Sequence, residues 1–250
     1  MKDFSEMVLD GIESGEVATG TTVKKRRLTA TLTRSDLLLG KDVSQAGRYC
    51  TLFTQADLLE KEEAREDLSR AVTAALLDLW GKRAKRVLAV GLGNPETVVD
   101  SLGCRTVNAL RTGQRKKGHL AAVVPSVYGM TGLETASLVR GVVEEYRPDL
   151  VLAVDTLSTR RAERLVHAVQ VGSGGVVPGG GVGNPRECLS RESLGVPVLT
   201  LGVPLLARAE RCSDLPEGLV VAPKEIDLWV PLFTRILAEG IESALLKQLG

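Results

Sequence analysis

The chain has 250 residues, which is enough for one large domain with a sizeable hydrophobic core or for two small ones. With 44% hydrophobic and 25% charged residues it is an ordinary globular protein, and its 3% of aromatic residues argues against a platform that stacks nucleic-acid bases. The formal net charge of +1 excludes a global field that would attract DNA or an anionic membrane, so any charged partner must be recognised locally.

The cysteines and the first twenty residues indicate a cytoplasmic protein. Residues 1–20 carry five acidic side chains and no long apolar run, so they resemble neither a signal peptide nor a membrane anchor. The cysteines are far apart and form no CxxC pair, which disfavours a zinc site and a disulfide framework. They are Cys50, Cys104, Cys188 and Cys212. We expect reduced thiols, no contact with a membrane, and no metal or cofactor.

The N-terminal third of the chain contains an unpatterned segment and then a helix. Residues 1–35 lack sustained periodicity and include the basic run Lys24–Arg27, which is typical of a solvated appendage. Between residues 57 and 80, apolar side chains recur at helical spacing and charged side chains occupy the other faces. This pattern predicts a long amphipathic helix.

From residue 86 onward, short apolar runs alternate with helical stretches. Such alternation implies right-handed crossovers and a mainly parallel sheet with helices on both faces, in a single α/β core domain. Strands are predicted at 86–90, 119–124 and 150–154, with further candidates at 166–171 and 197–201. Helices are predicted at about 97–110, at 133–146, where Pro148 follows, and at about 223–248, where Pro231 can introduce a kink.

Two acids fall at the predicted carboxyl edge of this sheet, where ligands bind in open parallel sheets. Asp155 follows the apolar run 151–154, and Asp100 lies early in the helix after the first strand. Each has a structural alternative, because Asp155 could cap the next helix and Asp100 could complement a helix dipole. As a close pair, however, one carboxyl group keeps its proton, and the two can activate water and polarise a carbonyl without a metal.

Other candidate motifs are weaker. The glycine-rich segment 172–184 could present backbone N–H groups to an oxyanion or phosphate, but it lacks a P-loop ending, and a flexible loop is the alternative. The histidines are His119 and His167, too few for a histidine-rich metal site. A Ser-His-Asp triad would have to use one of them, without a supporting nucleophile motif.

Several runs in order resemble the spore germination protease (GPR endopeptidase) family, from about residue 87 to the C-terminus. The resemblance includes Leu194–Val198, Gly202–Pro204 and Pro223–Asp227 near the end of the chain. Its earlier blocks are Gly91–Asn94, Asp100–Gly103, Tyr128–Thr135, Val154–Leu157 and Gly181–Asn184. Each block alone is weak, and the series is specific.

The resemblance implies an endopeptidase that degrades small acid-soluble spore proteins, on a fold similar to the hydrogenase-maturation proteases. It implies an atypical aspartic peptidase whose two essential aspartates match Asp100 and Asp155. It also implies a homotetramer in the spore core or forespore. The low net charge and the few aromatic residues already argue against direct contact with nucleic acid. The departures are a shorter chain and Val99 and Cys104 at positions where proline is usual; both acids remain in place.

Family members are made as zymogens that remove an N-terminal segment after an acidic residue. The run 33–38 resembles that junction, so Asp36–Leu37 is the candidate processing bond. This divides the chain into a candidate propeptide, residues 1–36, and a peptidase domain, residues 37–250. An ordinary floppy terminus is the alternative.

Further residues are candidates for assisting the two acids, and two other functions are possible for the same fold. Arg160, Gly181, Gly183 and Asn184 are candidates for positioning or polarising the peptide, although Arg160 could instead pair with Glu163 at the surface. A maturation-type peptidase that depends on a metal in its substrate would need a histidine beside the two acids. A spore protein that kept the fold without turnover is the non-enzymatic alternative.

Overall fold

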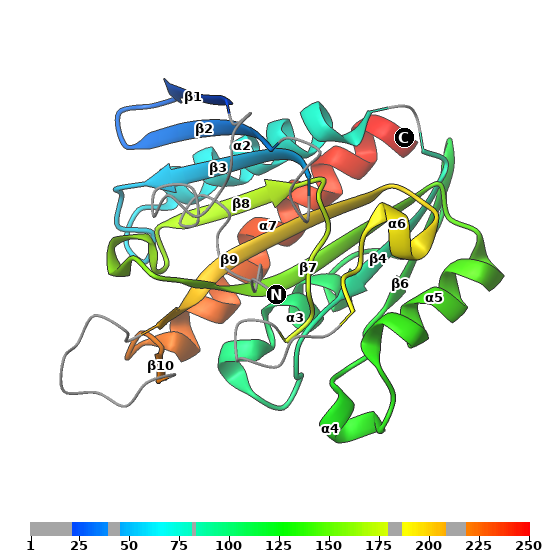
Figure 1. Ribbon diagram of the computed structural model, residues 1–250. Helices are drawn as coiled ribbons and strands as arrows, with labels where there is room; N and C mark the ends of the chain where they lie inside the picture. Colours follow the sequence, from blue (N-terminus) through cyan, green and yellow to red (C-terminus); the bar gives the residue numbers. More distant parts are fainter. Residues whose placement is uncertain (1–21, 40–45, 82–83, 180–186, 209–218) are drawn as a thin grey trace.

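The computed structural model describes residues 22–39, 46–81, 84–179, 187–208 and 219–250 (Figure 1). These residues form an α/β fold around one ten-stranded sheet, whose strand order is β1-β2-β3-β8-β9-β7-β4-β6-β5, with β10 paired to β9. The strands are β1 (Thr22–Arg27), β2 (Leu32–Leu39), β3 (Gly47–Thr54), β4 (Arg86–Gly91), β5 (Gly113–Arg115), β6 (Gly118–Val123), β7 (Leu150–Thr159), β8 (Ala168–Gly172), β9 (Val198–Arg208) and β10 (Val220–Val221). The helices are α2 (Glu62–Trp80), η1 (Val98–Asp100), α3 (Leu102–Asn108), α4 (Tyr128–Thr131), α5 (Thr135–Tyr146), η2 (Ala162–Arg164), α6 (Arg191–Leu194) and α7 (Ile226–Leu249).

The sheet is mixed, so the expectation of a mainly parallel sheet is wrong. Its four central strands β9, β7, β4 and β6 are parallel neighbours. Every other described pairing is antiparallel. The βαβ pattern of the sequence predicts only the parallel part, because the other strands join through hairpins and antiparallel neighbours. The expected similarity to hydrogenase-maturation proteases stays a prediction.

The antiparallel extension begins with a hairpin that the sequence pattern did not predict. Strands β1 and β2 pair from Thr22↔Leu38 to Arg27↔Thr33, and β2 pairs with β3 on its other side. The described part of the segment 1–35, which was expected to be an appendage, is therefore part of the sheet. Its basic run forms β1, whose described side chains at 24–27 are exposed, and such a charged edge strand resists pairing with other chains.

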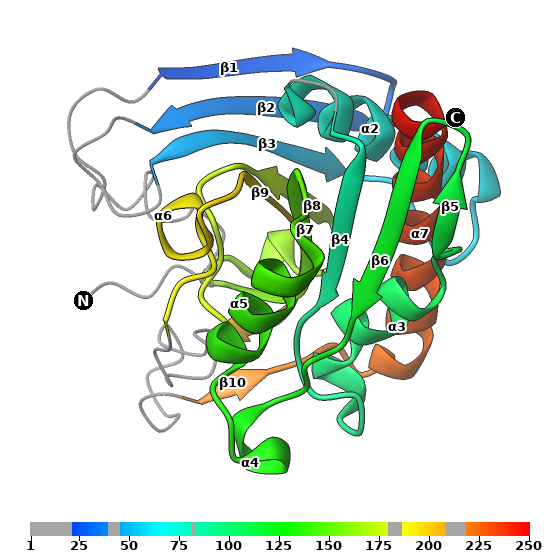
Figure 2. The same cartoon turned by 90° about the vertical axis from the view of Figure 1, so that its right-hand side faces the viewer.

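Helices cover both faces of the sheet, as the alternation of strands and helices predicts. On one face, α2, α3 and α7 pack on a large core that includes Leu76, Leu152 and Phe233. On the other face, α5 and α6 pack on a second core that includes Val90, Val139 and Leu194. Figure 2 shows α5 and the pair α2 and α7 on opposite sides of the twisted sheet.

The predicted elements exist, but several of their limits differ. Helix α2 begins at Glu62 rather than at 57, and the helix expected at about 97–110 is divided into η1 and α3. Strands β7 and β9 run well beyond the predicted ends at 154 and 201, because β-branched and apolar residues continue each strand. Helix α7 continues through Pro231.

Two further observations concern the environment of the chain. None of the described helices combines the length and the apolar character that crossing a membrane requires. Within the described part, Cys50, Cys104 and Cys188 form no disulfide, and Cys212 lies outside it.

Candidate active site

The turn after β4 holds Asp100 in a fixed position. The Asp100 carboxylate oxygen Oδ2 accepts a hydrogen bond from the backbone N–H of Asn94, with the two atoms 2.8 Å apart. Gly93 has a φ of +102°, and a Cβ there would lie 2.0 Å from the backbone oxygen of Asp100. The glycine of this turn is therefore required both by the left-handed backbone and by the close approach of Asp100.

Asp155 lies within β7, where it was expected to end a strand. Strand β7 continues to Thr159, but its pairing with β4 stops one residue earlier than Asp155, at Gly91↔Val154. Asp155 is thus the first residue of β7 beyond the end of β4. Its side chain is only 5% exposed, and its Oδ1 accepts the backbone N–H of Thr156 at 2.8 Å. The expected sheet edge is present because the neighbouring strand ends, not because β7 does.

Two contacts tie the segment that carries Asp100 to β7. The hydroxyl of Thr156 donates a hydrogen bond to the backbone oxygen of Val99, at 3.0 Å. At the start of α3, a Cβ on Gly103 would lie 2.2 Å from the backbone oxygen of Val154. Glycine at this position lets α3 pack directly on the strand, which brings the two acids to one place.

Asp100 and Asp155 line the same cavity, which has a volume of about 390 Å³. It lies beyond the carboxyl ends of β4 and β6, the edge where ligands of open α/β sheets bind. The other residues that line it are Gly93, Asn94, Thr97, Val99, Ser126, Val127, Tyr128, Gly129, Thr135, Thr156, Pro178, Gly179, Leu206 and Val220. Polar groups therefore meet around the acids, while apolar side chains form much of the remaining wall.

Burial raises the pKa values of both acids. It raises the pKa of Asp100 to about 6, and the N–H of Asn94 partly opposes this shift. Burial also raises the pKa of the more deeply enclosed Asp155 well above its ordinary value, and the negative charge of Asp100 raises it further. The protonated form is therefore favoured at both acids, and more strongly at Asp155 than at Asp100.

The thiol of Cys104 lies beside the turn that holds Asp100. Its Sγ is 3.5 Å from the backbone oxygens of both Leu92 and Gly93. Burial raises the pKa of Cys104 to about 11, and the charges of Asp100 and Asp155 add to the increase. A thiol kept neutral in this way is a poor nucleophile, and Cys104 is not among the residues that line the cavity.

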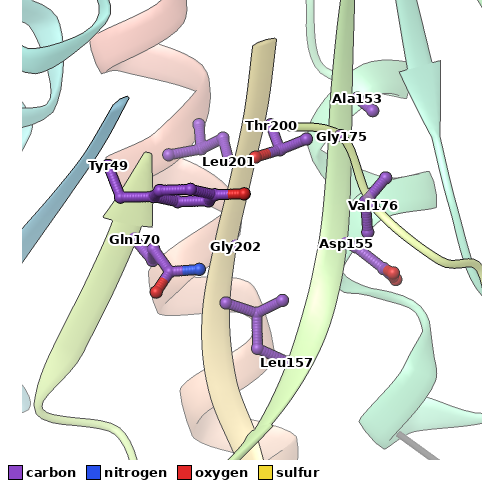
Figure 3. Close-up of a pocket in the computed structure, with 10 residues that line it drawn as sticks. All are labelled: Tyr49, Ala153, Asp155, Leu157, Gln170, Gly175, Val176, Thr200, Leu201 and Gly202. Atoms are coloured by element: carbon purple, nitrogen blue, oxygen red, sulfur yellow. The ribbon is translucent and has the colours of Figure 1, made fainter. Parts of the chain in front are cut away.

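Asp155 also borders a much smaller cavity, which residues of β3, β7, β8 and β9 help to line (Figure 3). Its volume of about 10 Å³ is close to that of one water-sized probe. Tyr49, Gln170 and Thr200 contribute polar side chains to it, and the Asp155 carboxyl group points away from the ring of Tyr49. Asp155 therefore lies between the two cavities and contacts both.

The predicted supporting residues have different outcomes. Arg160 follows the last residue of β7 and is not among the residues that line the larger cavity. Glu163, suggested as its surface partner, pairs with Arg161, with Nη1 and Oε1 3.5 Å apart. Gly181, Gly183 and Asn184 lie outside the described residues. Just before them, Pro178 and Gly179 do line the cavity.

The histidines lie elsewhere, which bears on the metal-dependent alternative. His119 is on β6 near its amino end, with its Nδ1 2.7 Å from the hydroxyl of Tyr146. His167 immediately precedes β8, and neither residue lines the cavity of the acids. In the parts of the chain that the structure describes, no three His, Cys, Asp or Glu side chains gather as a metal site would require.

Sequence reasoning missed one wall of the cavity. The segment Ser126–Gly129 enters it from the loop after β6, and Ser126 has a positive φ of 64°. Leu206 and Val220 come from the distant pair β9 and β10. The strained backbone at Ser126 follows Pro125, and that proline was the one local signal of an unusual turn.

The candidate processing bond Asp36–Leu37 lies within β2. Asp36 is the register partner of Cys50 on β3 and of Lys24 on β1. The side chain of Leu37 is only 4% exposed, and a carboxylate oxygen of Asp36 lies 2.7 Å from the guanidinium of Arg34. In the strand order, β3, β8 and β9 separate β2 from β7, which carries Asp155.

Comparison with known proteins identifies the family. The family described as germination protease matches residues 20–215, most of the chain. The germination protease of Caldanaerobacter subterraneus subsp. tengcongensis is 31% identical over 97% of this chain and 90% of its own length. That of Clostridium acetobutylicum is 30% identical over 96% of this chain and 92% of its own length. That of Oceanobacillus iheyensis is 35% identical over 69% of this chain and 50% of its own length. This chain therefore belongs to the germination protease family, and with it to the peptidases.

Proposed function

We propose that this protein is an endopeptidase of spore germination that cleaves small acid-soluble spore proteins, with Asp100 and Asp155 as its catalytic residues. One observation carries the catalytic assignment: both acids line one cavity, and their environments separate their pKa values. Such a separation assigns one acid and one base within a pair. Family membership supports the reaction class, and the substrate is proposed from the resemblance.

The proposed reaction uses the ionised and the protonated carboxyl group in turn. Asp100 takes a proton from a water molecule as the water oxygen attacks the peptide carbonyl carbon. Asp155 donates its proton to the carbonyl oxygen, which gives a neutral tetrahedral intermediate. Asp100 then gives its proton to the amide nitrogen, the C–N bond breaks, and the hydroxyl group returns a proton to Asp155. Both acids end in their starting states.

The environment of each acid fits its proposed role. Asn94 donates an N–H to Oδ2 of Asp100, which stabilises the ionised form. Asp155 is enclosed at 5% exposure, and its buried site favours the neutral form that can donate a proton. The loop Ser126–Gly129 and the segment Pro178–Gly179 both line the cavity. An extended peptide substrate would lie between these two segments.

The test is cleavage of a purified small acid-soluble spore protein by the full chain and by single variants. Asp100→Asn and Asp155→Asn should each lower the cleavage rate by about 10²-fold or more. Asp67→Asn is the matched control, because Asp67 lies on α2 and pairs with Arg70 at 2.7 Å, outside the cavity. Cleavage that survives both cavity substitutions would overturn the catalytic assignment. If neither the folded full chain nor a folded form that begins at Leu37 cuts a spore protein, the proposed substrate is wrong.

We also propose that the chain is made as a zymogen cut at Asp36–Leu37 and that it assembles as a tetramer in the spore core or forespore. Both follow from the family resemblance. Mass spectrometry of the incubated full chain should detect loss of residues 1–36, and Asp100→Asn should abolish that loss. An unchanged mass in active protein would contradict processing. Light scattering on the eluted protein measures the assembly state, and a monomer would contradict the tetramer.

A further inference from the structure

A second hollow lies at the end of the parallel strands opposite the two acids. Its volume is about 470 Å³, and it opens at the amino ends of β4 and β6, which begin at Arg86 and Gly118. The residues that line it are Lys85, Arg86, Gln114, Lys116, Lys117, Gly118, His119 and Tyr146. This basic hollow shares no residue with the cavity of the aspartates.

Four cationic side chains surround the basic hollow. Lys85, Arg86, Lys116 and Lys117 are all exposed, and none of them forms an ion pair with another described residue. The formal net charge of the chain is only +1, so the overall charge does not account for this local concentration. Four like charges around one concave surface repel one another, and a bound anion would relieve that repulsion.

Two carboxylates near the basic hollow, Asp149 and Glu242, already have partners. Oδ2 of Asp149 accepts the backbone N–H groups of Lys85 and Arg86, each at 2.8 Å. Glu242 pairs with Arg115, with 3.0 Å between Oε2 and Nη2. These contacts orient the two segments that meet here and leave the lysine ammonium groups facing solvent.

Backbone contacts fix the floor of the basic hollow. The N–H of His119 donates to the backbone oxygen of Lys85 at 2.7 Å, and a Cβ on Gly118 would lie 2.3 Å from that same oxygen. The Arg86 guanidinium lies 4.5 Å from the centre of the Tyr146 ring, whose hydroxyl contacts His119. The hollow is thus built from close-packed segments, and its charged side chains are exposed.

We propose that the basic hollow binds a small ligand that carries two or more phosphate groups. Its volume lies within the range of small-molecule sites, and lysine ammonium groups are phosphate binders that act as point charges. The four cationic residues all line one concavity, and Arg86 covers the ring of Tyr146. A single-stranded nucleic acid would instead require a charged track with open aromatic faces for its bases.

The test is isothermal titration calorimetry of the full chain with tripolyphosphate at constant ionic strength. We expect saturable binding at one site, weakened about tenfold or more by the double substitution Lys116→Gln and Lys117→Gln. The matched control is Lys24→Gln with Lys25→Gln on β1, which removes two exposed positive charges outside the hollow and should leave the affinity unchanged. Circular dichroism checks that each variant folds.

Two kinds of result would overturn the proposal. One is the absence of saturable binding, or equal weakening in both double variants, because either result means diffuse attraction at most. The other is binding of a single-stranded oligonucleotide that tripolyphosphate does not displace, because the site would then recognise nucleic acid. Displacement of the oligonucleotide by tripolyphosphate supports a site for phosphate groups. The measurement does not depend on peptidase activity, so it stands whether or not spore proteins are cleaved.

Discussion

Replacing Asp100 with asparagine should make the protein more stable at neutral pH while it abolishes cleavage. The change removes an ionised carboxyl group from a largely buried site and keeps its size. The negative charge that raises the pKa of Asp155 disappears with it. Asparagine cannot take a proton from water, so the proposed base is lost.

The magnitude follows from the difference between the pKa of Asp100 in the folded chain, about 6, and its ordinary value of 3.8. Because the folded-state pKa is raised, the stability associated with the protonated group is fully present below about pH 4 and is lost as the pH rises through 6. The difference of about two pKa units corresponds to about 3 kcal/mol. The unsubstituted chain should lose that much between pH 4 and 7, in addition to the loss caused by Asp155.

The assay is urea unfolding at several pH values between 4 and 7.5, for the unsubstituted chain, Asp100→Asn and the surface control Asp67→Asn. Between pH 4 and 7.5, the free energy of unfolding should decrease by about 3 kcal/mol less for Asp100→Asn than for the unsubstituted chain. The control Asp67→Asn should show the same decrease as the unsubstituted chain. Equal pH dependence in all three proteins would show that Asp100 is not held in a desolvated site beside Asp155, and the proposed division of roles would fail with it.

Three further predictions concern the same cavity. The cleavage rate should rise with pH through about 6 as Asp100 ionises and fall at higher pH as Asp155 loses its proton, so a flat pH–rate profile would contradict the two-acid mechanism. Gly93→Ala should lower the free energy of unfolding by about 3 kcal/mol or more, because the new Cβ would lie 2.0 Å from a backbone oxygen. Gly129→Ala is the control, because a Cβ there would meet no atom of another part of the chain within 4 Å. Equal effects of the two substitutions on thermal unfolding would refute the explanation. Thr156→Val should lower the free energy of unfolding by about 1–2 kcal/mol and reduce cleavage, because the Thr156 hydroxyl group connects β7 to η1. Thr156→Ser should restore both the stability and the cleavage rate. If Thr156→Val changes neither urea unfolding nor cleavage, the hydroxyl group does not have this role.

The sequence predicts the central parallel strands and the meeting of the two acids, because both depend on local patterns. Short apolar runs alternating with helices define β4, β6 and β7, and the rule for parallel sheets places Asp100 and Asp155 at one edge. The family resemblance selects the same residues, and their common cavity agrees with that choice. The catalytic role itself stays a prediction.

The antiparallel half of the sheet and one wall of the cavity could not be predicted in this way. Strand β1 is a run of charged residues, which reads as a solvated tail until β2 is known to pair with it. The contribution of Leu206 and Val220 depends on the pairing of β9 with β10, a contact between distant segments that no local period records. The basic hollow likewise arises from two runs about thirty residues apart that meet only in the folded chain.

The position of Asp36–Leu37 within β2 has a consequence for the timing of any processing. A peptidase binds its substrate as an accessible extended segment, whereas this bond lies in a strand that is paired on both sides. Cleavage there must wait until the β1–β2 hairpin leaves the sheet, so local opening of the hairpin sets the rate rather than the chemistry of the acids. The stability of the N-terminal hairpin would then determine how soon the chain is processed. Mild denaturant or a weakened contact between β2 and β3 would make processing faster.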